Sequence, residues 1–296
     1  MSTAIDARAA GLRDRLRGAL VAAAATPMTA DGRVDLDVTE SYYRALLASG
    51  ADALAVLAHT GRGPYLSLDL RASLIARARA TGAPVLVGVS AGTAGRSAAE
   101  HAKVAAELGA DGVLVFPSDG DRVAEHDAVW RAAGLPMIAF DLYTQPCPPE
   151  ILRRIVSHPG VAGLKTALLS DAMACQEAIA LTREADRLAL TGEDRMFGPS
   201  LLWGAEAALV GVAAAQARVT AEVLRAFRGS DLRAFDRASA RLDRLAAATF
   251  TAPMEGYVQR MLWLAADEGL IPASHAFDPF GPGLGDVPLT AKAVFA

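Results

Sequence analysis

Residues 84–90 read Pro-Val-Leu-Val-Gly-Val-Ser, and residues 112–117 read Gly-Val-Leu-Val-Phe-Pro. Both stretches are apolar throughout and have the length of a strand. Between them, Ser97–Leu108 carries apolar residues at helical spacing and begins with a good N-cap residue. Continuous apolar strands that alternate with amphipathic helices indicate a parallel sheet covered by helices.

The same unit recurs along the chain. Six further strand-like runs are Ala19–Met28, Ala53–His59, Pro136–Leu142, Val161–Ala167, Leu188–Glu193 and Ala207–Ala214, and further helical spacing occurs at Val38–Leu47, Leu68–Ala80 and Pro149–Ser157. Eight such units predict an α/β fold of the (β/α)8 TIM-barrel type. The alternative is a doubly wound open sheet, which usually has a glycine-rich turn after its first strand, where this chain has Thr26-Pro27-Met28.

We expect three segments: an N-terminal helical segment at 1–17, the barrel at 18–228, and C-terminal helices with a tail at 229–296. Apolar residues continue at helical spacing to about Gly269, so extra helices should follow the barrel. The tail from Ile271 is rich in proline and glycine, and we expect it to lie on the surface.

The composition is that of a soluble enzyme, with 52% hydrophobic residues, 21% charged residues and a net charge of −4. No basic cluster points to nucleic acid, and no apolar stretch is long enough to span a membrane. Cys147 and Cys175 form neither a disulfide framework nor a metal-ligand pair, and Met1–Leu16 lacks the apolar core of a signal peptide. These features predict a cytoplasmic protein without nucleic-acid or membrane partners, and the scattered histidines predict no metal site.

Lysine is rare in this chain: of 29 basic residues only Lys103, Lys165 and Lys292 are lysines. Lys165 ends an apolar strand, and barrel enzymes carry their chemistry at the carboxyl ends of the strands. Burial there disfavours the ammonium form, and a neutral amine can attack a ketone to form an imine. The alternative is a lysine in a structural salt bridge at the strand end.

Several motifs occur in an order that resembles the dihydrodipicolinate synthase / N-acetylneuraminate lyase family of class I Schiff-base aldolases. They are Ala25-Thr26-Pro27-Met28, Thr60-Gly61, Gly163-Leu164-Lys165 and Gly192-Glu193-Asp194. The resemblance covers roughly residues 18 to 270 and implies a lyase that acts on pyruvate or another 2-keto acid, usually as a homo-oligomer, a tetramer or a dimer. It also implies that Lys165 forms the Schiff base without a cofactor.

The chain departs from the family at the ends of the second, fourth and fifth strands, which makes it a divergent member; at the fourth, Phe116-Pro117-Ser118-Asp119 lacks the family's tyrosine. Where the family commonly has Gly-Thr-Thr-Gly-Glu after the second strand, this chain has Ala58-His59-Thr60-Gly61-Arg62. The family's proton-relay tyrosine corresponds to Phe140, which has no hydroxyl, and Tyr143 replaces it only if the following loop turns inward. We therefore expect a product other than dihydrodipicolinate.

The catalytic candidates are Lys165, Tyr143, His59 and Thr60, and the substrate-binding candidates are Arg62, Thr26, Asp141 and Glu193. His59 is suited to acid–base chemistry near neutral pH, and Arg62 to a substrate carboxylate. The alternatives are a hydrogen bond from His59 to a loop and an ion pair of Arg62 with a nearby acid. Of Glu193 and Asp194, at most one should face the barrel axis, and the other should cap the following helix.

The leading functional hypothesis is a Schiff-base lyase, an aldolase or dehydratase acting on a 2-keto acid such as pyruvate or a sugar-derived keto acid. A second hypothesis is a non-catalytic or regulatory ligand-binding barrel, because the family's tyrosine positions and paired threonines are changed. A weaker third reading is a metal-dependent barrel hydrolase. The sequence leaves the substrate, and the choice between aldol cleavage and dehydration, open.

Overall fold

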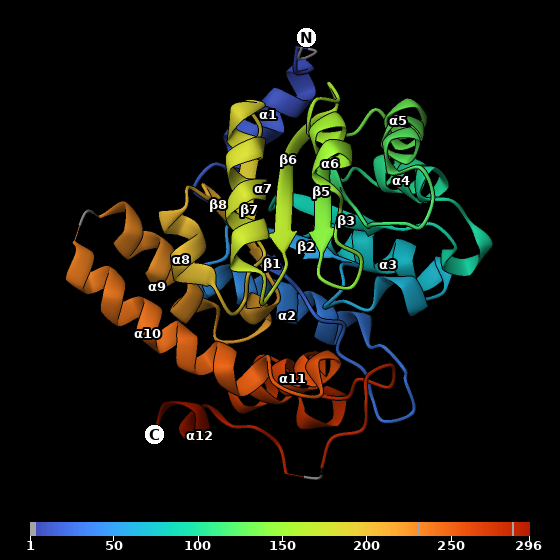
Figure 1. Cartoon of the computed structure of the whole chain (residues 1–296). Coiled ribbons are helices and arrows are strands. Elements are labelled where there is room, and N and C mark those ends of the chain that lie inside the picture. Colours follow the sequence, from blue (N-terminus) through green and yellow to red (C-terminus); the bar gives the residue numbers. More distant parts are fainter. Residues whose placement is uncertain (1–3, 230, 286) are drawn as a thin grey trace.

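A computed structural model describes residues 4–229, 231–285 and 287–296. Eight parallel strands close into a barrel in sequence order, with β8 pairing back onto β1. The strands are β1 (Leu20–Ala23), β2 (Ala53–Val56), β3 (Val85–Val89), β4 (Gly112–Val115), β5 (Met137–Leu142), β6 (Val161–Ala167), β7 (Leu188–Thr191) and β8 (Ala207–Val210). The (β/α)8 prediction is therefore confirmed, and the open doubly wound sheet is excluded (Figure 1).

Helices follow the strands around the barrel: α2 (Leu36–Ala48), α3 (Leu68–Arg79), α4 (Ala98–Glu107), α5 (Arg122–Ala133), α6 (Pro149–Val156), α7 (Ala172–Glu184), α8 (Phe197–Leu202) and α9 (Ala217–Arg228). Side chains that satisfy free backbone N–H groups begin several of them. Ser97 and Glu100 form a reciprocal capping box at α4, and Pro149 occupies the first turn of α6, as the sequence indicates.

Helix α1 (Ala7–Leu16) closes the amino end of the barrel. Its Ala9, Leu12 and Leu16 belong to the same apolar cluster as the inward-facing strand residues, such as Leu114 and Leu209. In Figure 1 this helix lies at the end away from the strand arrowheads. Access to the barrel interior is therefore left to the carboxyl end.

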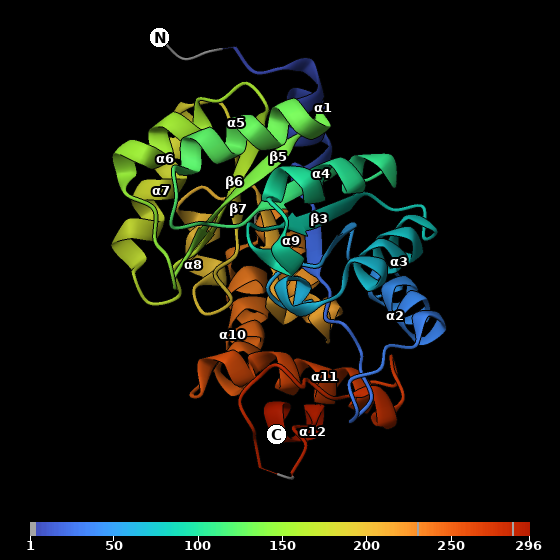
Figure 2. The ribbon, with the colours of Figure 1, turned by 90° about the vertical axis from the view of Figure 1, so that its right-hand side faces the viewer.

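Three further helices, α10 (Leu232–Thr249), α11 (Tyr257–Asp267) and α12 (Ala291–Phe295), follow the barrel, as expected. They lie on the side toward which the strands point, and Figure 2 shows α11 and α12 at the end opposite α1. The tail is not purely a surface segment, because Phe277 N donates to Met28 O and the Asp278 side chain is 1% exposed. The division into 1–17, 18–228 and 229–296 stays a prediction.

No helix among the described residues combines the length and the apolar character needed to cross a bilayer.

Candidate active site

The register of the barrel decides which strand-end side chains face inward. Phe140 on β5 pairs with Lys165 on β6, which pairs in turn with Leu190 on β7. All three point into the barrel, because neighbouring side chains along a strand point to opposite faces. For the same reason Asp141 and Thr166 point outward toward the helices.

Lys165 is enclosed at the bottom of the barrel mouth. Its side chain is buried, and its Nζ lies 4.2 Å from the centroid of the Phe140 ring. Burial lowers the pKa of Lys165, although the negative charges of Asp194 and Glu193 oppose that shift. Gly192 makes the space for this lysine, since a Cβ at that position would lie 2.4 Å from Lys165 Cε.

Asp194 and Glu193, which end β7, face different environments. Asp194 lines the same cavity as Lys165, and its Oδ1 accepts a hydrogen bond of 2.7 Å from the Val212 backbone N–H. Burial raises the pKa of Asp194 even though this hydrogen bond and the charge of Lys165 oppose the change. The single inward-facing acid of this pair is therefore Asp194.

Glu193, the acid that the sequence favoured for substrate binding, turns away from the cavity. Its two carboxylate oxygens accept 2.7 Å hydrogen bonds from the backbone N–H groups of Leu168 and Leu169. It thus secures the loop after β6 rather than capping the following helix, α8, whose N-cap residue is Met196 and which has no side-chain cap. A substrate-binding role for Glu193 is not supported by this placement.

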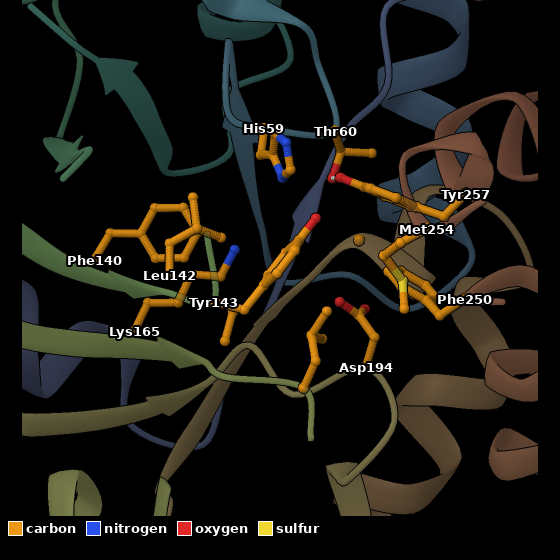
Figure 3. Close-up of a pocket in the computed structure, with 13 residues that line it drawn as sticks. His59, Thr60, Phe140, Leu142, Tyr143, Lys165, Asp194, Phe250, Met254 and Tyr257 are labelled. Carbon is orange, nitrogen blue, oxygen red and sulfur yellow. Dashed lines mark hydrogen bonds between the residues drawn. The ribbon is translucent and has the colours of Figure 1, made fainter. Parts of the chain in front are cut away.

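Two separate sets of hydrogen bonds lie at the mouth of the barrel, one between Thr60 and Tyr257 and one network around Glu255. The Thr60 hydroxyl lies 3.1 Å from the Tyr257 hydroxyl, and Tyr143 donates to Glu255 Oε1 over 2.5 Å. His59 Nε2 lies 3.2 Å from Glu255 Oε2. Figure 3 shows the Tyr143 hydroxyl pointing toward His59 and Thr60. The loop after β5 therefore turns inward, as a relay role for Tyr143 requires.

Glu255 is the hub of this network and lies in a short turn, Met254–Gly256, just before α11. Burial alone would raise the pKa of Glu255, but hydrogen bonds and charge from His59, with Tyr143 and Arg62, hold it well below the usual range. Burial, and then the adjacent Glu255 carboxylate, raise the pKa of Tyr143, which therefore stays protonated. Glu255 is an ionised carboxylate that holds three side chains in place: Tyr143, His59 and Arg62.

Arg62 does not reach the cavity, contrary to the expected contact with a substrate carboxylate. Its guanidinium pairs with Asp278 Oδ2 at 2.7 Å and Glu255 Oε2 at 2.9 Å, and it also donates to the Glu255 backbone carbonyl. The Arg62 and Asp278 side chains are almost fully buried. Arg62 is thus already satisfied, as the ion-pair alternative predicts.

Thr26 and Asp141 are also directed away from the cavity. The Thr26 hydroxyl donates 2.7 Å to the Gly61 carbonyl, which fixes the loop that carries Thr60. Asp141 accepts from the Cys147 backbone N–H at 2.8 Å on the outer side of the sheet. Both residues hold loops in place and neither lines the cavity, so this placement does not support their expected contact with substrate.

The cavity itself is small, with a volume of about 20 Å³. That is room for roughly one water molecule. Its walls combine the strand-end residues with Phe250, Met254 and Tyr257 from the segment between α10 and α11 (Figure 3). A substrate therefore has to displace side chains on binding.

Sequence reasoning missed the contribution of the C-terminal segment. None of Met254, Glu255 and Tyr257 is among the candidates predicted from the sequence. The one available signal is that polar and apolar residues in this stretch do not follow a single helical face. Within the described part of the chain, no group of His, Cys, Asp and Glu side chains forms a candidate metal site.

The fold and the site together define a class: a (β/α)8 barrel with a buried lysine at the carboxyl end of its sixth strand. The chain belongs to the dihydrodipicolinate synthetase family, whose family model matches residues 16–289. The family resemblance inferred from the motifs is thereby confirmed.

Named sequence relatives agree with this family assignment. A 4-hydroxy-tetrahydrodipicolinate synthase of Acidiphilium cryptum (strain JF-5) is 30% identical over 236 residues, which cover 73% of this chain and 77% of the relative. The protein of the same name from Synechococcus sp. (strain CC9605) is 32% identical over 230 residues, 71% of each chain.

Solved structures share the fold at lower sequence identity. The prophage protein YagE of E. coli K12, solved in complex with pyruvate, has a TM-score of 0.80 and 20% identity, with 90% of this chain and 93% of that chain covered. N-acetylneuraminate lyase from Mycoplasma synoviae has a TM-score of 0.75 and 18% identity, with 95% of each chain covered.

Proposed function

We propose that this protein is a Schiff-base-forming lyase, an aldolase or dehydratase, that acts on a small 2-keto acid such as pyruvate. The observation that carries the proposal is Lys165, a buried amine with a lowered pKa that lines a cavity at the barrel mouth. A lysine in such a desolvated site is a candidate nucleophile. The pyruvate complex of YagE and the synthase names of the sequence relatives support the same chemistry.

The first step is formation of an imine. The neutral Lys165 amine attacks the C2 carbonyl, an N–C bond forms, and the carbonyl oxygen leaves as water with protons from nitrogen and from a nearby donor. The resulting iminium is positively charged and withdraws electrons from the bond to be cleaved. Asp194, which lines the same cavity, is the carboxylate that stabilises this charge.

Tyr143 is the proposed proton donor. It takes the place of the hydroxyl missing at Phe140, and its raised pKa keeps the proton on oxygen until substrate arrives. Glu255 orients Tyr143 and His59 through hydrogen bonds, so these two groups are the acid–base candidates. Thr60 lies beside them and is proposed to receive the keto-acid carboxylate through its hydroxyl or backbone N–H.

Arg62 is proposed as a positioning residue, because it reaches the cavity only through Glu255. Its pairing with Asp278 fixes the turn that carries Glu255 to the barrel. The homo-oligomeric state and the cytoplasmic location stay predictions.

Reductive trapping tests the proposal. The protein is incubated with pyruvate and borohydride, and the modified peptide is located by mass spectrometry. Lys165 should gain the mass of the reduced adduct, Lys165→Gln should gain none, and Lys103→Gln, which alters an exposed helical lysine, should label like the parent. If the folded protein is not labelled at Lys165 by pyruvate or by any member of a broad panel of keto acids, the non-catalytic barrel becomes the better account.

A further inference from the structure

Apolar side chains line much of the cavity around the Lys165 amine. Phe140 and Leu142 come from β5, Leu169 follows β6, and Phe250 and Met254 come from the segment after α10. In Figure 3, Phe140 and Leu142 lie on one side of the amine, and Met254 and Phe250 lie across the cavity. Any chain that extends from the reacting carbons therefore meets hydrocarbon on more than one wall.

The polar side chains that line the cavity around the amine already have hydrogen-bond partners within the protein. Thr60 and Tyr257 share a hydrogen bond, and Tyr143 is bound to Glu255. Asp194 accepts from a backbone N–H of its own chain. Beyond the groups proposed to bind the carboxylate and to move protons, a substrate hydroxyl that enters this space gives up its water and has to compete for groups that are already bonded, which is unfavourable.

From this lining we infer that the substrate is a 2-keto acid whose chain beyond the reacting carbons is hydrocarbon, alkyl or aryl, and not polyhydroxylated. The inference rests on the proposed function, because it places the keto group at Lys165. It excludes the sugar-derived keto acids that the sequence leaves open, and it adds an apolar chain to the keto-acid head that pyruvate represents.

The boundary between cavity and solvent fits the same substrate class. Leu169 and Met254 are half-buried, so they lie between the enclosed space and the outside. Both side chains have several rotamers, and methionine in particular adapts to irregular apolar shapes. Their displacement opens the small cavity while keeping the new wall apolar.

A matched pair of ligands tests the inference. The probes are 4-hydroxy-2-oxohexanoate and its 4,5,6-trihydroxy analogue, which share a six-carbon skeleton and the hydroxyl on the reacting C4, together with pyruvate as the reference. The concentration of each that gives half-maximal trapping at Lys165 is measured by mass spectrometry and corrected for the free-keto fraction by NMR. Because buried hydrocarbon at C5 and C6 favours binding and unpaired hydroxyls there oppose it, the 4-hydroxy compound should half-saturate at a concentration at least about tenfold lower than the trihydroxy compound.

Met254→Gln should reduce this preference at least about threefold, because it replaces an apolar wall atom with an amide of similar size. Met173→Gln, the same change at a side chain that is 74% exposed, should leave it as in the parent. Equal or tighter trapping of the trihydroxy analogue, with pyruvate still trapped, overturns the inference and leaves the proposed function standing. Failure to trap any of the three keto acids overturns both.

Discussion

Gly192→Ala is the change whose effect on Lys165 follows most directly from the structure. The added Cβ would lie 2.4 Å from Lys165 Cε and 2.5 Å from the Thr166 carbonyl oxygen. Ordinary contact needs roughly 3.4 Å or more, so the lysine has to retreat by about 1 Å. The backbone has less freedom, because Gly192 N donates to the same Thr166 oxygen.

An error of about 1 Å in the placement of a reacting group lowers its rate by on the order of a hundredfold. Overpacking of this kind also destabilises a fold by about 1 to 3 kcal/mol, which a barrel of this size tolerates. We therefore expect Gly192→Ala to remain folded and to trap pyruvate at Lys165 at roughly one hundredth of the parent rate.

The assay is the initial rate of borohydride trapping at fixed pyruvate, paired with urea unfolding. Gly11→Ala is the matched control, because nothing lies within 4 Å of a Cβ at that position in α1. It should trap at the parent rate and be no less stable, since alanine favours a helix over glycine. Parent-like trapping by folded Gly192→Ala would refute the placement of Lys165 argued above.

Three further outcomes are expected. Arg62→Gln leaves Asp278 buried without its cation and should lower the free energy of unfolding in urea by about 3 to 5 kcal/mol, whereas Arg33→Gln, at an exposed pair, should leave it nearly unchanged. Burial lowers the pKa of Lys165 to about 8, so the rate of trapping should rise with pH up to that value and then level off. The rate is divided by that of a simple alkylamine at each pH, which removes the pH dependence of the borohydride reaction itself. A corrected rate that still rises past pH ~10 contradicts the expectation. Asp141→Asn should keep the parent trapping rate, because its side chain faces the helices, and a hundredfold loss without unfolding would show that it serves the reaction.

The barrel was predictable from the sequence because the patterns that define its strands and helices lie within short stretches of the chain. Each strand is a short apolar run and each helix has its own period and cap, so the order of elements is enough to give the closed sheet. Lys165 was found for the same reason, since it ends a strand whose residues alternate inward and outward. The same alternation, applied to Phe140 and Asp141, would have removed Asp141 from the site.

The remainder of the site depends on contacts between distant parts of the chain. Arg62 pairs with Asp278, 216 positions away, and Tyr143 bonds Glu255, 112 positions away. No periodicity links such residues, so the sequence leaves open whether Arg62 contacts a substrate carboxylate or pairs with an acid, and it does not name Asp278 as the partner. Both partners belong to the C-terminal segment, whose position over the barrel mouth is a property of tertiary packing.

The central claim is that Lys165 forms an imine with a keto acid in a cavity where Tyr143 is the proton donor. A crystal structure of the protein soaked with pyruvate tests it most directly. The account predicts continuous density from Lys165 Nζ to C2 of the ligand, with the Tyr143 hydroxyl within hydrogen-bonding distance of the adduct. A free Lys165 amine, with pyruvate bound non-covalently or at another site, would contradict it.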